Sequence, residues 1–153
     1  MLTRYLLLAG ASVTLLEAGQ CGREASWAGG GIVSPLYPWR YAPAVTRLSE
    51  QAWELFRSLC ADLYAETSID AEYSPTGMLM LDAPDAEQAL QWSAAHNIPV
   101  QALQGQAIRT IEPACADSSS SALWMPQVAN VRNPRLLKAL LASVKQFAQC
   151  QLR

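Results

Sequence analysis

Residues 12–34, SVTLLEAGQCGREASWAGGGIVS, contain the pattern from which the fold of this chain can be predicted. Val13, Leu15 and Leu16 form an apolar run of strand length, and Glu17 stands at its carboxyl end. Three consecutive glycines, 29–31, begin twelve residues after this acid. An acid after a buried strand can bind a ribose diol, and glycines let backbone N–H groups approach a pyrophosphate or a flat ring. The stretch therefore predicts a nucleotide-binding site.

The residues before this stretch predict a helix that leads into the strand. Leu2, Tyr5 and Leu6 recur at helical spacing, and Gly10 stands where helices often end. A helix, a glycine turn and a strand form the second half of a βαβ unit. In dinucleotide-binding units the ribose-binding acid follows a glycine-rich phosphate loop by about 20 residues, which places that loop ahead of Met1. We expect the first strand and the phosphate loop to be absent from this sequence.

A single long helix is predicted from Pro43 to about Glu66, because proline suits the first helical position and apolar residues recur along one face. The residues of this face are Val45, Leu48, Ala52, Leu55, Phe56, Leu59 and Leu63. The segment before it, 35–41, is too rich in proline and aromatic residues for regular structure. We interpret that segment as part of the surface or as a pocket wall.

The middle of the chain predicts short strands that alternate with helices. Residues 78–81, MLML, follow a turn signal and are apolar on both faces, which favours a central strand. His96 is placed near the end of a helix, where it would interact with the helix dipole and not act in catalysis. The other predicted elements are a helix at 85–97, a strand at 100–103, a helix at 106–111, a polar loop at 117–121, a strand at 122–125 and an extended piece at 128–132.

The last predicted helix begins at Asn133, the expected capping residue, with Pro134 at its first position. Its apolar face is expected to contain Leu137, Leu140, Leu141, Val144 and either Phe147 or Ala148. A βαβ arrangement requires a strand after such a helix, and none is predicted before the sequence ends. The sheet is therefore expected to be open at this end as well.

Composition excludes several classes of function. The net charge of −2, the pI near 5.3 and the absence of a Lys/Arg run argue against nucleic acid as a partner. No segment reaches the roughly 18 consecutive apolar residues of a membrane helix, and residues 1–11 match a signal peptide only weakly, so we expect a cytoplasmic protein without stable membrane insertion. Reduced thiols and no metal site are expected because the only histidine and the four cysteines are widely spaced: His96, Cys21, Cys60, Cys115 and Cys150.

Residues 12–35, together with Val131-Arg132-Asn133-Pro134, resemble the FAD-dependent amine oxidases of the D-amino-acid oxidase family, and most closely its glycine oxidase branch of the thiamine-biosynthesis type. The resemblance extends over essentially the whole chain, and the order strand, acid, Ala-Ser-x-Ala-Gly-Gly-Gly is its most specific part. It implies an α/β fold: a Rossmann-type FAD-binding βαβ unit, here without its first strand and Gly-rich loop, interleaved with part of a mixed-sheet, α+β substrate domain.

The same resemblance implies FAD as the cofactor, a small amine or amino acid such as glycine as the substrate, and O2 as the oxidant that yields H2O2. The residues it assigns are Glu17 for the adenosine ribose, Ala25 and Ser26 for the pyrophosphate, and Gly29, Gly30, Gly31 and Ile32 for the passage beside the isoalloxazine ring. Ile32 would also lie near the substrate. No catalytic acid or base and no metal ligand is assigned.

The expected organisation has four parts. Residues 1–42 form a partial FAD-binding domain, 43–70 a long helix at the domain junction, 71–130 a partial substrate domain, and 131–153 a helix that returns to the FAD-binding domain. Two functional hypotheses follow: the N-terminal part of an FAD-dependent oxidoreductase, or a catalytically inactive fragment that serves as a weak nucleotide-binding or interaction module. The open sheet edge favours self-association into a homo-oligomer.

Overall fold

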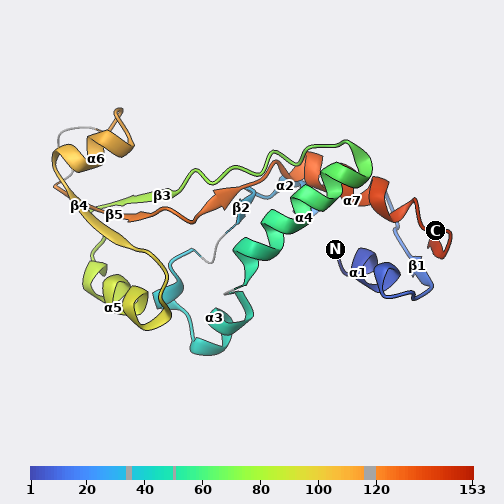
Figure 1. Cartoon of the computed structure of the whole chain (residues 1–153), viewed down its shortest axis with the longest axis horizontal. Coiled ribbons are helices and arrows are strands. Elements are labelled where there is room, and N and C mark those ends of the chain that lie inside the picture. Colours follow the sequence, from blue (N-terminus) through green and yellow to red (C-terminus); the bar gives the residue numbers. More distant parts are fainter. Residues whose placement is uncertain (34–35, 50, 116–119) are drawn as a thin grey trace. The chain divides into compact units, whose positions relative to one another are not determined.

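The structure, a computed structural model, describes residues 1–33, 36–49, 51–115 and 120–153 (Figure 1). The chain divides into two compact units, each assembled from segments that are distant in the sequence. The first unit consists of Met1–Ile32, Glu54–Ser74 and Asn130–Arg153. The second unit consists of Val33–Trp53 and Pro75–Ala129. The four-part domain boundaries expected from the sequence stay a prediction.

The first unit begins as predicted with a helix, a glycine turn and a strand. Helix α1 (Leu2–Leu8) ends in a turn where Gly10 adopts a φ of +84°, a left-handed conformation that glycine reaches without steric cost. Strand β1 (Val13–Leu15) follows, as the apolar run predicts. Glu17 therefore lies just beyond the carboxyl end of a strand, where the dinucleotide-binding pattern requires its acid.

The strand that was not predicted after the last helix is present. Helix α7 (Asn133–Val144) leads into β7 (Cys150–Leu152), which pairs with β1 in parallel (Figure 1). The expectation that no strand closes this end was wrong. The three residues Cys-Gln-Leu lack the β-branched and aromatic side chains that indicate strands, so only the pairing with β1 identifies them. The helix-then-strand order completes a parallel pair of the Rossmann type.

The single long helix predicted from residue 43 to 66 is two helices, α3 (Pro43–Ser49) and α4 (Ala52–Thr67), and Glu50 lies outside the described residues. The predicted apolar face is buried only in α4, where Leu59 and Leu63 are almost inaccessible. Three of its other residues are exposed, namely Val45, Leu48 and Leu55. One stripe cannot stay on one buried face across two separate helices, because each helix packs in its own orientation.

A buried arginine links three helices of the first unit. Arg4 of α1 is 3% exposed and donates hydrogen bonds to the carboxylate of Glu66 in α4 and to the hydroxyl of Ser143 in α7. Ser143 in turn donates to Glu66 over 2.5 Å. The buried face of α7 includes Ser143 and so differs from the predicted one. Its members are Leu136, Ala139, Leu140, Ser143 and Val144.

The second unit contains a three-stranded antiparallel sheet in the order β3 (Met78–Leu81), β5 (Ser121–Met125), β4 (Gln101–Gln104). Strand β3 was expected to be central, but in the described residues it is an edge strand and β5 is central. One face of the sheet packs on helix α5 (Ala86–His96), which forms where it was predicted. The buried core consists of Trp39, Met80, Ala89, Trp92, Val100, Leu123, Met125 and Val128.

The proline-rich segment was interpreted as part of the surface or as a pocket wall. Trp39 contributes to this core, contrary to a surface position, whereas Tyr37 and Arg40 line a pocket of about 320 Å³. Residues Pro38–Arg40 form a short 3₁₀ helix, η1, and Trp39 is 5% exposed. Its indole N–H donates to Asp85 over 2.7 Å, and the guanidinium of Arg40 binds the same carboxylate at 2.5 and 2.9 Å. Burial of a tryptophan is favourable once its N–H has an acceptor, which local composition does not reveal.

The remaining elements are short. Helix α6 (Gln106–Ile111) has its predicted bounds, and β2 (Ile32–Val33) pairs with β6 (Ala129–Asn130). The predicted polar loop at 117–121 lies partly outside the described residues.

The ring nitrogen Nδ1 of His96 lies 3.0 Å from the carbonyl of Trp92, and the His96 ring stacks on the Trp92 ring at the end of α5. All four cysteines are free. In the described part of the chain, no helix could span a bilayer, and no group of residues could hold a metal ion.

Candidate functional site

The main chain around Glu17 continues the pairing between β1 and β7. The N–H of Glu17 donates to the carbonyl of Arg153 over 2.9 Å, and the N–H of Arg153 donates to the carbonyl of Leu15 over 3.0 Å. The carboxylate Oε1 of Glu17 accepts a hydrogen bond from the N–H of Gly19 at 2.9 Å. A carboxylate can accept about four hydrogen bonds, so this half-exposed group is held in place and retains capacity for a ligand diol.

Ala25 and Ser26 lie in α2 (Ala25–Ala28), a single helical turn that was not predicted. Both side chains are exposed and small, and the first N–H groups of a helical turn have no partner within it. The guanidinium of Arg23 stacks 3.8 Å from the ring centroid of Trp27, which accounts for its position without a phosphate. At Ala25 and Ser26 the turn thus offers backbone donors with only small side chains beside them.

The three glycines are held against the start of α7. The side-chain amide Nδ2 of Asn133 donates to the carbonyl of Gly29 over 2.9 Å, and the N–H of Val131 donates to the carbonyl of Gly31 over 2.8 Å. A Cβ on Gly31, whose φ is +73°, would lie 2.0 Å from the Val131 oxygen, and one on Gly29 would lie 2.8 Å from Asn133 Nδ2. A Cβ on Gly30 would meet no described atom within 4 Å.

Both parts of the candidate site are therefore anchored by one segment, residues 131–153. Its first residues hold the glycines, and its last residue holds the main chain of Glu17. All the residues predicted for the site, 17–32, belong to the first unit, and Ile32 at its end is 51% exposed. The two sequence stretches that carry the family resemblance, one around the glycines and one at 131–134, meet in space.

The sequence interpretation missed what Asn133 does. We expected its side chain to cap α7, but the residue at the capping position is Arg132, and Asn133 donates to the glycine loop. Val131 was also not assigned to the site. The only signal in the sequence was that both residues belong to one of the two stretches on which the resemblance rests.

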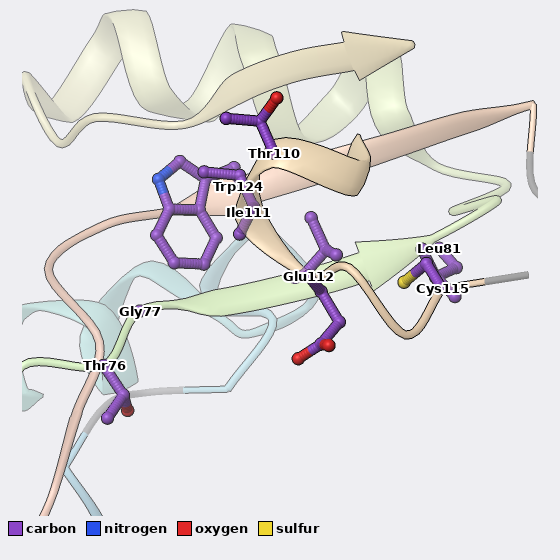
Figure 2. Close-up of a pocket in the computed structure, with 9 residues that line it drawn as sticks. Thr76, Gly77, Leu81, Thr110, Ile111, Glu112, Cys115 and Trp124 are labelled. Atoms are coloured by element: carbon purple, nitrogen blue, oxygen red, sulfur yellow. The ribbon is translucent and has the colours of Figure 1, made fainter. Parts of the chain in front are cut away.

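A separate pocket of about 570 Å³ lies within the second unit (Figure 2). It lies on the face of the sheet opposite the core, because Leu79 and its cross-strand partner Trp124 both line it. Figure 2 shows Ile111 and Glu112 reaching it from the end of α6. None of the residues predicted for the site is among those that line it, so the pocket does not enter the cofactor hypothesis.

Comparison with known proteins matches these features to one family. A family model described as "FAD dependent oxidoreductase" (DAO) matches residues 1–149. The chain is 47% identical over 149 residues to the glycine oxidase of Pseudomonas aeruginosa and 43% identical over 141 residues to that of Pseudomonas putida. These alignments cover 97% and 92% of this chain but 41% and 39% of the relatives, so the chain spans about two fifths of their length.

A solved structure shows the same fold. The crystal structure of glycine oxidase from Geobacillus kaustophilus matches with a TM-score of 0.85 at 24% identity, over 99% of this chain and 42% of that one. The predicted α/β fold, with its partial Rossmann-type unit and part of a mixed sheet, is confirmed. The glycine loop leaves room for a planar cofactor at its middle residue, because a Cβ on Gly30 would meet no described atom within 4 Å.

Proposed function

Because the chain belongs to the FAD dependent oxidoreductase family DAO, we propose that residues 17–32 hold the ribose and the isoalloxazine ring of FAD. The observation that carries this proposal is the common anchoring of Glu17 and the glycine loop by residues 131–153. Such anchoring presents an acid and an open stretch of backbone from a fixed scaffold, and cofactor sites need that preorganisation.

The proposed roles follow from the chemistry of each residue. The carboxylate of Glu17 accepts hydrogen bonds from the ribose hydroxyls, and the small residues Ala25 and Ser26 let backbone N–H groups approach the pyrophosphate. Gly29, Gly30 and Gly31 pass beside the ring, and the exposed Ile32 lies on the substrate side. The cofactor itself supplies the hydride acceptor and the reactivity toward O2.

For the complete protein we propose oxidation of glycine or of another small amine or D-amino acid. The substrate loses a hydride and a proton to become the imine, O2 is reduced to H2O2, and water converts the imine to a 2-oxo acid and ammonia. This proposal is supported by the two relatives named glycine oxidase, at 47% and 43% identity. A cytoplasmic location and a role in thiamine biosynthesis belong to the same proposal.

A titration of the 153-residue chain with FAD, followed by flavin fluorescence, tests the cofactor site. We expect weak binding, with a Kd above about 0.1 mM, because the 153 residues titrated contain no Gly-rich phosphate loop ahead of α1. Glu17→Gln should weaken binding further, whereas the matched charge change Glu54→Gln, at an exposed residue of α4 outside the candidate site, should not. Equal affinities for the wild type and Glu17→Gln, or tight stoichiometric binding, would contradict the assignment.

A chimera tests the reaction. In it, this chain replaces the matched 41% of the Pseudomonas aeruginosa glycine oxidase. We expect the chimera to bind FAD and to release H2O2 from glycine or sarcosine in a peroxidase-coupled assay. A folded chimera that carries FAD and oxidises neither would contradict the proposed substrate class.

The alternative, an inactive binding or interaction module, is favoured by one observation. Several large apolar side chains of α1 and the one directly after β1 are exposed, including Leu2, Leu8 and Leu16. Patches of this kind often mark protein–protein interfaces. Sedimentation of the chain over a range of concentrations distinguishes the two hypotheses: a stable oligomer without FAD affinity supports the module, and a monomer that binds FAD supports the enzyme fragment.

A further inference from the structure

The carbonyl groups of Gly29 and Gly31 both point toward the start of α7. Gly29 accepts from the side chain of Asn133 at 2.9 Å, and Gly31 accepts from the main chain of Val131 at 2.8 Å. A peptide bond is planar and trans, so its C=O and its N–H point in opposite directions. The N–H of Gly30 and the N–H of Ile32 therefore point away from α7.

The direction of these two donors depends on different groups. The N–H of Ile32 is oriented by the main-chain hydrogen bond from Val131 to Gly31. Any residue except proline at position 131 could make that bond. Gly30 is oriented by a side chain, so its direction depends on residue 133 being an asparagine or another donor of that length. A Cβ on Gly30 would meet no described atom within 4 Å, so the space beside this residue is open. The Asn133 amide is thus the group that sets this peptide.

Asn133 is itself held firmly. Pro134 follows it with a fixed backbone angle, and α7 is anchored by buried residues one turn later, among them Leu136 and Ala139. The side-chain amide of Asn133 donates to the loop over 2.9 Å and not to its own helix, of which Arg132 is the capping residue. A fixed donor on a rigid helix is the arrangement by which a supporting residue orients a binding group.

We propose that Asn133 is a positioning residue of the flavin site, which turns the N–H of Gly30 toward the side on which the ring binds. The inference rests on the proposed FAD function and adds Asn133, which acts on the cofactor through Gly30. A flat heterocycle with carbonyl and ring-nitrogen acceptors is the ligand that two outward N–H groups, at Gly30 and Ile32, would recognise.

The test compares Asn133→Ala with Ser143→Ala in titrations of the chain with FAD. Both variants lose hydrogen bonds made by α7, but Ser143 contacts Arg4 and Glu66 and not the loop. We expect Asn133→Ala to weaken FAD binding about fivefold to tenfold, as the loss of one oriented donor predicts. Ser143→Ala should lower the melting temperature and leave the FAD affinity unchanged.

Amide hydrogen exchange of the FAD-free wild type gives a second measurement that does not need a variant. The N–H of Gly30 should exchange rapidly, and the side-chain N–H of Asn133 should be protected. Protection of Gly30 without FAD, or equal FAD affinity of the wild type and Asn133→Ala, would overturn the positioning role. A wild type that binds no FAD would instead reject the proposed function, so the two failures are distinguishable.

Discussion

The two units differ in how they reach stability. In the second, Leu123 and Met125 are each 1% exposed in a core formed by a sheet, a helix and two tryptophans. In the first, Leu2 and Leu16 are 73% and 75% exposed, although they belong to the helix and the strand end that introduce the candidate site. Parallel sheets are normally covered on both faces. The unit that carries the proposed cofactor residues is therefore the less completely buried one.

The first unit combines an apolar core, which includes Leu7, Leu59 and Leu63, with specific polar contacts between its helices. Arg4 joins α1 to Glu66 and Ser143, and Asn133 joins α7 to the glycine loop. Such contacts orient elements without requiring a large core, and they fix a binding site more narrowly than apolar packing does. In this chain apolar burial stabilises both units, whereas hydrogen bonds define the candidate site.

The largest expected effect is a core deletion in the second unit. Leu123→Ala should lower the free energy of unfolding by about 3–5 kcal/mol, because it leaves a cavity among buried neighbours. The matched change Leu8→Ala in α1, at a side chain that is 54% exposed, should alter it by less than about 0.5 kcal/mol. Urea unfolding measures both. Similar losses for the two variants would show that burial does not set the cost at these two positions.

A glycine substitution should have the next largest effect. A Cβ on Gly77, whose φ is +72°, would lie 1.8 Å from the ring of Trp124, so Gly77→Ala should cost about 2–4 kcal/mol through the clash and the backbone strain. Gly30→Ala in the first unit is the control, because its Cβ would meet no described atom within 4 Å. Thermal melts of both proteins check the difference, and a stable Gly77→Ala would show that Trp124 can move aside.

The polar linkage of the first unit is tested by Arg4→Met. Removing the guanidinium leaves Glu66 and Ser143 without their shared partner, and we expect a loss of about 2 kcal/mol, less than for a fully buried pair because the Glu66 side chain is 30% exposed. The double variant Arg4→Met/Glu66→Met should recover part of that loss in denaturant unfolding. Additive losses in the double-mutant cycle would mean that the pair is not coupled.

The smallest effect concerns pH. Hydrogen bonds from Arg40, and then from Trp39, hold the pKa of Asp85 well below its usual range. A carboxyl whose pKa is lower in the folded state contributes stability above its unfolded pKa of about 4, and this contribution is lost as the pH falls through the folded pKa. Below about pH 4 the melting temperature of the wild type should therefore fall more steeply than that of Asp85→Asn. Parallel slopes would show that this carboxylate is not linked to folding.

Sequence patterns predicted the elements that local chemistry determines. The turn at Gly10, the helix start at Pro43 and the strand at 78–81 each depend on residues next to one another, and the structure has all three. The acid after β1 was also placed correctly, because a short apolar run with an acid at its end is a local signal.

What the sequence did not reveal depends on partners distant in the chain. Strand β7 has a weak local signal and exists through its pairing with β1. Trp39 is buried because Asp85, 46 residues away, accepts its N–H. Asn133 was interpreted as a cap from its local position before Pro134. Its actual partner, Gly29, lies 104 residues earlier and could not be identified from that position. Local patterns do not encode such choices of partner, and two of the three concern the site-bearing unit.

The most direct measurement of the central claim is NMR mapping of FAD binding on the isotopically labelled chain. The account predicts that chemical-shift changes concentrate in the first unit, at residues 17–32 and 131–133, and spare the second unit. Changes centred on the pocket around Trp124 and Glu112, with none at Glu17 or at the glycine loop, would contradict it.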